Sequence, residues 1–360
     1  MKLTINTIKL QDMVTKASKG VGNNKLIPIT CMMGLNRSEA DGFEIVTTDA
    51  TNYLYIDDDS LKGEKFSVTV YADTFVKLIS KITCETVSME IKDNYLEVVG
   101  NGTYKIELPF DENGNIIEFP NPIKDAEADE NFSHIKLSNI QTILNSVKPA
   151  LAVTLENPEY TNYWLGDSVI ATDSYKIAKY DLKVVDKPIL ISAEMMNLLS
   201  VMTAEDILFH FIGDGIAFVT ADCIVYGKLP AGITEYKSDD IKSLTDSEYP
   251  YCCEVNKTAL LQLLDRIALF IRPFDDGNLT IAFHPTTLDI TSLANSGTES
   301  IPYIAIHSEI TEPFASSINI ELLQSQVKSN ISDSVKIEFG RPDSIKIVDG
   351  TITKVIALNE

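Results

Sequence analysis

One pattern occurs three times in this chain, with a period of about 120 residues, and it limits the possible folds more than any other feature. Each copy has a short strand with an amphipathic helix, a hairpin, a second strand with a helix, and a closing meander of strands. Apolar residues recur at helical spacing in the helix segments and alternate in the strand segments. The same order in three successive copies argues against a chance run of strands and helices.

Each helix is expected to follow directly on a strand. The opening strand and helix are predicted at 2–5 and 10–21, at 134–137 and 140–151, and at 252–255 and 260–271. The second strand and helix are predicted at 66–70 and 72–82, at 188–191 and 193–202, and at 315–318 and 320–327. Asp73, Ser192 and Asn319 stand where helix N-caps are expected.

Strands joined by turn residues supply the sheets. Hairpins are predicted at 43–48 with 52–56, 164–170 with 175–182, and 278–283 with 288–293. The meanders are predicted at 87–108, 207–229 and 335–358. We therefore expect an α+β fold of three tandem domains, each with two helices packed on antiparallel sheets. The segment 120–122 with the acidic run 125–130, and the polar stretch 238–247, place these domains at residues 1–122, 123–247 and 248–360.

The composition narrows the class of protein. No apolar run approaches the roughly 18–20 residues of a membrane span, and the N-terminus lacks the apolar core of a signal peptide. A cytoplasmic protein with no membrane partner is therefore expected. The cysteines form no C-x-x-C pair, which favours free thiols over a disulfide framework or a zinc site; they are Cys31, Cys84, Cys223, Cys252 and Cys253.

Motifs of catalysis are not found. The sequence has no phosphate-binding glycine loop, no nucleophile elbow and no H-E-x-x-H, and its four histidines have no metal-ligand spacing. No catalytic residue, metal or cofactor is therefore predicted. Asp49 and Asp173 occupy equivalent repeat positions in Thr-Asp pairs, which favours a structural role such as accepting hydrogen bonds from turn amides.

The residues Ile170-Ala171-Thr172-Asp173-Ser174-Tyr175-Lys176-Ile177-Ala178 resemble the segment Ala-Thr-Asp-Gly-His-Arg-Leu-Ala of the bacterial DNA polymerase III beta subunit, the DNA sliding clamp. Weaker similarities in the same order occur at residues 1–6, 27–29, 47–49 and 118–120. The resemblance implies a non-catalytic processivity factor. It also implies a head-to-tail homodimer that closes a ring around double-stranded DNA, and short peptide motifs through which a DNA polymerase and a clamp loader bind.

The net charge of −22 taken alone argues against DNA binding, because binding to phosphates requires positive charge. The distribution of the charges along the chain removes this objection. The six helix windows together contain ten basic and five acidic residues, so the acidity is concentrated on sheets and loops. If the helices line a pore, the DNA-facing residues are expected to be Lys16, Lys19, Lys25, Lys77, Lys81, Lys148, Arg266 and Arg272. The alternative is that each is only a solvated side chain.

By the resemblance, partner peptides enter an apolar groove between the second and third domains. The matching residues are Tyr160, Thr172, Ser174, Tyr175, Lys176, Ile177, Pro250, Ile356, Ala357 and Leu358. Three of these, Ile177, Ile356 and Leu358, have an alternative interpretation as core strand residues. The sequence departs from the family in Ser174-Tyr175-Lys176, in the segment after Pro250 and in the tail Asn359-Glu360. A phage or mobile-element clamp with altered partner preference would account for these changes.

The resemblance also implies a dimer interface with Tyr104, Ile106, Leu269 and Phe270. For Ile106 and Leu269 the alternative is a place in the core of a domain. Two other functions stay open beside the clamp. One is an interaction protein of the same fold that is not loaded onto DNA, and the other is a hydrolase whose site the sequence does not reveal.

Overall fold

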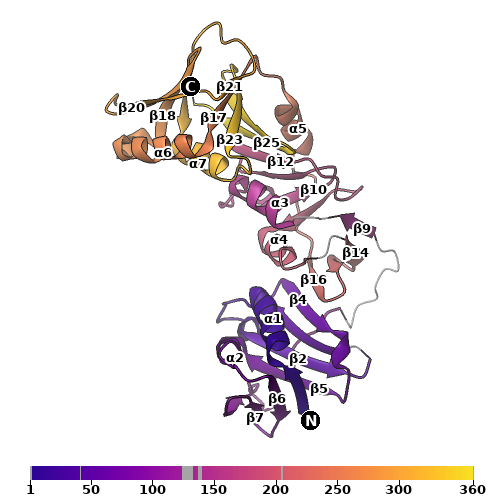
Figure 1. The fold of residues 1–360 in the computed structure, drawn as a ribbon. Helices are drawn as coiled ribbons and strands as arrows, with labels where there is room; N and C mark the ends of the chain where they lie inside the picture. Colours follow the sequence, from indigo (N-terminus) through magenta and orange to yellow (C-terminus); the bar gives the residue numbers. More distant parts are fainter. Residues whose placement is uncertain (1, 41, 124–132, 137–139, 204–205, 360) are drawn as a thin grey trace. The chain divides into compact units, whose positions relative to one another are not determined.

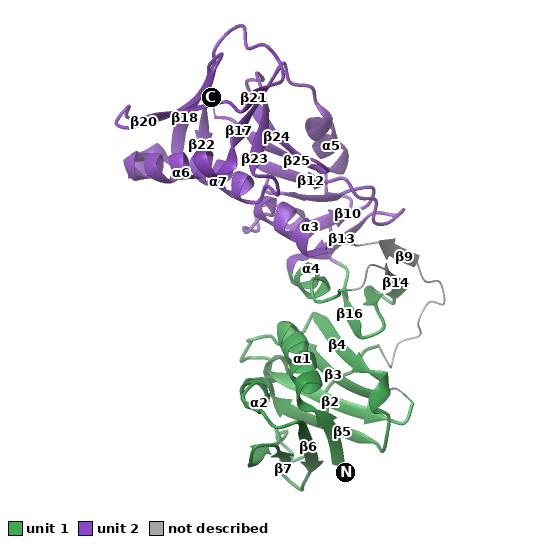
Figure 2. Ribbon diagram, in the orientation of Figure 1, with its two compact units in different colours: residues 1–138, 194–229 green, residues 139–193, 230–360 purple. Residues whose placement is uncertain are grey.

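The computed structural model describes residues 2–40, 42–123, 133–136, 140–203 and 206–359. The chain divides into two compact units, residues 1–138 with 194–229 and residues 139–193 with 230–360 (Figure 2). The second sequence copy is thus shared between the units. The domain boundaries inferred from the sequence stay predictions, and the acidic run 125–130 lies outside the described residues.

The first unit contains two antiparallel sheets (Figure 1). The four-stranded sheet has the order β1-β6-β7-β8, and the eight-stranded sheet has the order β5-β2-β3-β4-β16-β15-β14-β9. The strands are β1 (Lys2–Asn6), β2 (Met32–Ser38), β3 (Gly42–Thr48), β4 (Asn52–Asp58), β5 (Phe66–Tyr71), β6 (Thr86–Ile91), β7 (Tyr95–Val99), β8 (Thr103–Glu107), β9 (Ser133–Lys136), β14 (Asp206–Ile212), β15 (Gly215–Val219) and β16 (Cys223–Lys228). The helices are α1 (Thr7–Ala17), α2 (Ala72–Ile79) and α4 (Ala193–Leu199), which begins at the unit's edge.

The second unit also has two sheets, in the orders β13-β10-β11-β12-β25-β24-β23-β17-β21 and β20-β19-β18-β22. Its strands are β10 (Asn162–Leu165), β11 (Val169–Thr172), β12 (Lys176–Tyr180), β13 (Ile189–Ser192), β17 (Tyr251–Asn256), β18 (Asn278–Phe283), β19 (Thr287–Ser292), β20 (Thr298–Pro302), β21 (Ala305–Ile306), β22 (Phe314–Asn319), β23 (Ser334–Phe339), β24 (Ser344–Asp349) and β25 (Ile352–Ala357). Its helices are α3 (Ile140–Val147), α5 (Ser238–Asp246), α6 (Lys257–Ile267) and α7 (Ile320–Lys328).

The predicted fold class and order of elements are confirmed. The apolar stripe of α6, which includes Leu260, Leu263, Leu264 and Ile267, is buried in one core with strands of both sheets of its unit. The predicted strand at 134–137 is seen as β9, although Leu137 itself lies outside the described residues.

Within the described ranges, asparagine caps three helices. Asn319 accepts hydrogen bonds from the amides of Glu321 at 2.9 Å and Leu322 at 3.2 Å, so its predicted N-cap role is confirmed. The prediction for Asp73 is wrong, because α2 begins one residue earlier and Asp73 lies in its first turn. Asn6 and Asn256, which the sequence reasoning did not select, cap α1 and α6.

The two Thr-Asp pairs form the same turn. Asp49 Oδ1 accepts hydrogen bonds from the amides of Thr51 and Asn52 at 2.8 and 2.7 Å. Asp173 Oδ1 accepts them from the amides of Tyr175 and Lys176 at 3.0 and 2.9 Å. The structural role predicted for both aspartates is confirmed, since each carboxylate satisfies turn amides that would otherwise lack a partner.

Candidate functional site

A small pocket lies where β12 pairs with β25 in the second unit. The two strands are antiparallel, with Ile177 opposite Val355. The pocket has a volume of about 110 Å³, and we call it the junction pocket; it is lined by Ser174, Tyr175, Ile177, Leu244, Asp343, Ser344, Val355 and Ala357. Figure 1 shows α5 on one side of β12 and β25 and α3 and α7 on the other, and Leu244 belongs to α5.

Four residues that the sequence singled out line this pocket: Ser174, Tyr175, Ile177 and Ala357. Lys176 and Ile356 are opposite each other in the strand pairing and are not among the lining residues. Successive strand residues point to opposite faces of a sheet, so a contiguous run of matched residues cannot all face one pocket. Ile356 and Leu358 instead belong to the buried core beneath the sheet.

The other three matched residues, Tyr160, Thr172 and Pro250, do not line the pocket. Tyr160 packs edge-on against Tyr236, with ring centroids 5.3 Å apart, in the core cluster that also holds Ile177. Thr172 is buried and donates a hydrogen bond to the carbonyl of Lys176 at 2.9 Å. Pro250 lies against Gly340, where an added Cβ would come within 2.5 Å of the proline ring.

Four lining residues were missed by the sequence reasoning: Leu244, Asp343, Ser344 and Val355. Residues 238–247 were interpreted as a polar boundary stretch, yet they contain α5. Ile241, Leu244 and Thr245 stand at helical spacing, a signal that could have revealed the helix. Asp343, which precedes β24, and Ser344, its first residue, could be assigned to the pocket only from the strand pairing.

The helix α5 is held in place by charges on both sides. Lys242 pairs with Asp167 at 2.9 Å and lies 4.4 Å from the centre of the Trp164 ring. Asp246 pairs with Lys179 of β12 at 2.7 Å. These partners lie on β10, on the turn between β10 and β11, and on β12, so the contacts tie α5, which carries Leu244, to the sheet beside the junction pocket.

Asp343 is the charged residue of the pocket lining. Arg341 donates to both of its carboxylate oxygens at 3.1 Å, and this hydrogen bonding holds the pKa of Asp343 below its ordinary value. The neighbouring Ser344 hydroxyl lies 2.9 Å from the hydroxyl of Tyr249. The rim is therefore ionised and hydrogen-bonded at neutral pH, while the floor is apolar.

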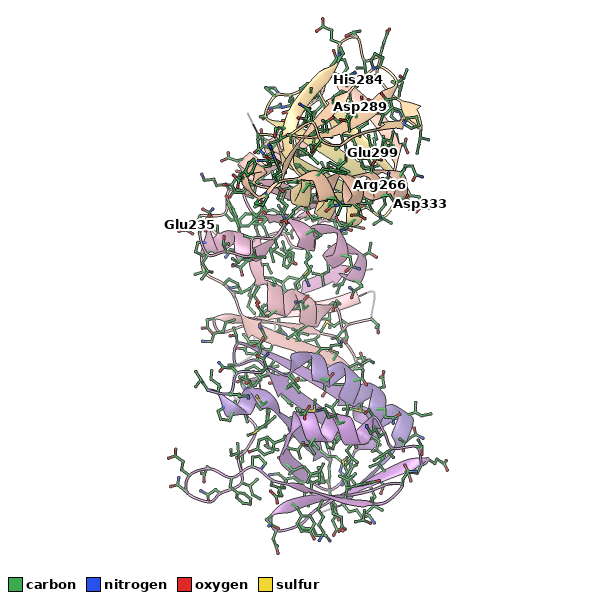
Figure 3. All side chains as sticks on the ribbon, turned by 90° about the vertical axis from the view of Figure 1, so that its left-hand side faces the viewer. Glu235, Arg266, His284, Asp289, Glu299 and Asp333 are labelled. Carbon is green, nitrogen blue, oxygen red and sulfur yellow. The ribbon has the colours of Figure 1, made fainter. Side chains whose placement is uncertain are left out.

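Half of the predicted DNA-facing cations are paired with local carboxylates. Lys16 pairs with Asp12 and Asp222, Lys77 with Asp73, and Arg272 with Asp275. Arg266 of α6 donates to both carboxylate oxygens of Glu299 on β20 at 2.8 and 2.6 Å, and Figure 3 labels this pair. Within the described ranges, no ion pair is seen for the exposed side chains of Lys19, Lys25, Lys81 and Lys148.

The four predicted interface residues differ in burial. Ile106 is only 5% exposed and packs inside its own unit, whereas Leu269 is 81% exposed. Tyr104 lies on the edge strand β8, and Phe270 follows α6; both side chains are partly exposed. Three of these four side chains are thus accessible on the single chain.

In the described part of the chain, no helix is long and apolar enough to cross a bilayer. No group of three or more His, Cys, Asp and Glu side chains there is arranged to hold a metal ion.

Comparison with known proteins identifies the first copy by its sequence. Residues 1–118 match the family model of the DNA polymerase III beta subunit, N-terminal domain. Among curated protein sequences there is no match.

Solved structures match the whole chain. The DNA polymerase sliding clamp of Bacillus subtilis has a TM-score of 0.81 at 18% identity, covering 100% of this chain and 99% of that one. The beta subunit of the Streptococcus pyogenes DNA polymerase has a TM-score of 0.84 at 16% identity and covers 100% of both chains. The DNA polymerase III subunit beta of Pseudomonas aeruginosa has a TM-score of 0.80 at 14% identity, again with full coverage of both. Residues 1–118 are therefore similar to the N-terminal domain of the DNA polymerase III beta subunit family, and the whole chain has the fold of the solved sliding clamps.

Proposed function

We propose that this chain is a DNA sliding clamp, a non-catalytic processivity factor of the cytoplasm. Two copies join head to tail into a closed ring around double-stranded DNA. The ring tethers a DNA polymerase and accepts a clamp loader through short peptides that bind the junction pocket.

The proposed closed ring is supported by a strand pairing that occurs twice within the chain. Copies one and two are joined where β4 pairs with β16, and copies two and three where β12 pairs with β25. The repeat order makes β20 the counterpart of β4 and β12, and β8 the counterpart of β16 and β25. Both β20 and β8 are sheet edges within the described chain. A second copy would pair β8 with β20 and so remove both edges at once, which closed head-to-tail assembly requires.

The DNA-facing role is supported by four exposed lysines for which no acidic partner is seen among the described residues. Lys19 and Lys25 follow α1, Lys81 follows α2, and Lys148 follows α3. A few unpaired cations favour duplex DNA without many tight phosphate contacts, which suits a ring that must slide. The paired cations Lys16, Lys77, Arg266 and Arg272 are expected to contribute less.

The tethering role is supported by the junction pocket. It is concave, has an apolar floor of Ile177, Val355, Ala357 and Leu244, and has a polar rim. Small pockets of this composition accept the side-chain anchors of short peptides.

The decisive test is topological. The chain is loaded by a clamp loader onto nicked circular DNA, and retention during gel filtration is compared before and after the circle is linearised. We expect retention on the circle and rapid loss from the linear form. Equal loss from both would contradict encirclement and favour the alternative of an interaction protein of the same fold that is not loaded.

A further inference from the structure

A second pocket lies within the first unit, between the end of α1 and the first turns of α2. Figure 1 shows these two helices next to each other. The pocket has a volume of about 430 Å³, which is within the range of roughly 300–1,000 Å³ found for small-molecule sites. We call it the helix pocket, and it is a candidate binding site separate from the junction pocket.

The space in the helix pocket is left by small side chains, which include those of Ser18, Cys31 and Ala72. The loop after α1 closes one side, because Gly22 allows it to lie against Thr30; a Cβ on Gly22 would come within 2.9 Å of the Thr30 Cβ. Val21 of this loop and Val76 of α2 complete the apolar walls. The pocket is therefore mainly apolar, although it is open to solvent.

The loop that carries Lys25 to the rim is hydrogen-bonded within itself. The Thr30 hydroxyl lies 3.2 Å from the carbonyl oxygen of Asn24 and 2.8 Å from that of Ile27. The amide of Leu26 donates to the side-chain oxygen of Asn24 at 3.0 Å. The rim is thus preformed, which lowers the ordering cost of binding a ligand.

The lining of the helix pocket carries three charged side chains, Lys25, Asp73 and Lys77. Lys77 pairs with Asp73 along α2 at 2.6 Å. Among the residues that the structure describes, no ion pair is seen for Lys25. The lining therefore has one uncompensated positive charge beside an apolar surface. Such a surface is complementary to a molecule with an apolar body and a single negative charge.

We propose that the helix pocket binds a small organic monoanion. Its apolar body lies against Val21, Ala72 and Val76, and its anionic group lies beside Lys25. Binding of this ligand does not depend on the proposed function. Its consequence does: Lys25 is one of the proposed DNA-facing lysines, so an anion held beside it would weaken binding to duplex DNA.

The test uses the full chain with methyl-labelled Ala and Val, titrated with naphthoate, an aromatic carboxylate of the proposed chemistry. We expect the methyl signals of Val21, Ala72 and Val76 to shift, with a Kd of about 1 mM, as is reasonable for a ligand of this size in an open site. The neutral naphthylmethanol should bind about two- to fivefold more weakly, since Lys25 is exposed and contributes modestly. The cationic naphthylmethylammonium should bind more weakly still, and these differences should shrink in high salt.

Variants separate the charge from the apolar walls. Lys25→Ala should abolish the preference for naphthoate over naphthylmethanol, and Lys25→Arg should retain it. Val76→Thr replaces one methyl group of a partly exposed wall residue by a hydroxyl and should weaken all three probes about equally. Lys62→Ala removes an exposed lysine of the same unit outside the pocket and should leave every affinity unchanged.

Three outcomes would overturn the inference. Equal affinities of the three probes for the unaltered chain would remove the anion preference. A titration that shifts none of the helix-pocket methyl signals would remove the site. Shifts confined to Val355 and Ala357 would place the probe in the junction pocket instead.

Binding to DNA gives a separate readout. Saturating naphthoate should weaken binding to a short duplex by about two- to fivefold, and Lys25→Ala should remove this effect. Unchanged duplex affinity would overturn the link to DNA. If naphthoate binds but the chain is not retained on circular DNA, the site stands and the proposed function fails. Retention on the circle without naphthoate binding would give the reverse result.

Discussion

At the residue scale, Lys354 of β25 is unusual because its side chain is fully buried. Its ammonium donates to the carbonyl of Gln326 and the hydroxyl of Ser329 at 2.9 and 2.8 Å, at the C-terminal end of α7. Burial lowers its pKa to about 7, against a partial opposing effect of Asp349. The counterpart in the other strand junction is the apolar Val225, so the repeat does not require a lysine there.

The depressed pKa predicts a pH dependence of stability. Between about pH 7 and the ordinary lysine pKa near 10.5, the unfolded chain binds more protons than the folded chain. The free energy of unfolding should therefore rise with pH, by about 1 kcal/mol per unit from this residue. Lys354→Met should remove that slope, as measured by urea unfolding from pH 7 to 10. The exposed Lys328→Met should retain it; an unchanged slope in Lys354→Met would contradict the assignment.

A second prediction at this scale concerns the repeated turn. Ala50 and Ser174 adopt left-handed backbone angles, with φ of 86° and 79°. A side chain there costs about 1 kcal/mol or more, which glycine avoids. Ala50→Gly is expected to raise the free energy of unfolding by about 0.5–1 kcal/mol. The same change at Ala259 in α6 should lower it by about 1 kcal/mol. Thermal unfolding of both variants checks the opposite signs.

At the scale of elements, the two strand junctions have the same pairing but different outer faces. The counterparts of Ile177, Val355 and Ala357 at the β4–β16 junction are Tyr53, Tyr226 and Lys228. The two tyrosine rings lie 6.2 Å apart, and Lys228 forms an ion pair with Asp214 at 2.9 Å. These larger side chains fill the space that is open at the other junction, which explains why equivalent elements offer different surfaces.

The surroundings of Gly215 allow a prediction about the packing at the β4–β16 junction. A Cβ on Gly215 would lie 2.8 Å from the Tyr226 ring and 2.7 Å from the carbonyl oxygen of Gly227, whereas its counterpart, Ser344, carries a side chain. Gly215→Ala should lower the free energy of unfolding by about 1–3 kcal/mol. In a Tyr226→Val background the loss should be smaller, which a double-mutant cycle by urea unfolding would measure. Additive losses would mean that the ring does not fill the site.

At the scale of the whole molecule, the proposed ring depends on edges and exposed anchors that a single chain leaves uncovered. Phe270→Ala should weaken the dimer, because aromatic anchors contribute a large share of interface energy. Sedimentation over a dilution series should show dissociation at higher concentration than for the unaltered chain. Leu155→Ala, an equally simple truncation of an exposed side chain in the second copy, should leave the dimer unchanged. Unchanged sedimentation of Phe270→Ala would remove that residue from the interface.

The net charge of −22 makes DNA affinity depend on few cations. Replacing Lys25 and Lys81 together by alanine should weaken binding to a short duplex and reduce the slope of log affinity against log salt by about 2, since each phosphate contact contributes about 1. Lys62→Ala, which removes an exposed lysine outside the helices, should change neither. An unaltered salt slope in the double variant would place both lysines away from DNA.

The sequence by itself determined the repeated order of elements, the α+β class and the Asp49 and Asp173 turns, because periodicity and turn chemistry are local. Only the tertiary structure decided that Tyr175, Ile177 and Ala357 share a pocket while Lys176 and Ile356 do not, since strand register and facing depend on distant partners. It also brought Leu244 to that pocket and paired Arg266 with Glu299, 33 residues away. Packing and ion pairing join residues far apart in the chain, and no local pattern specifies them.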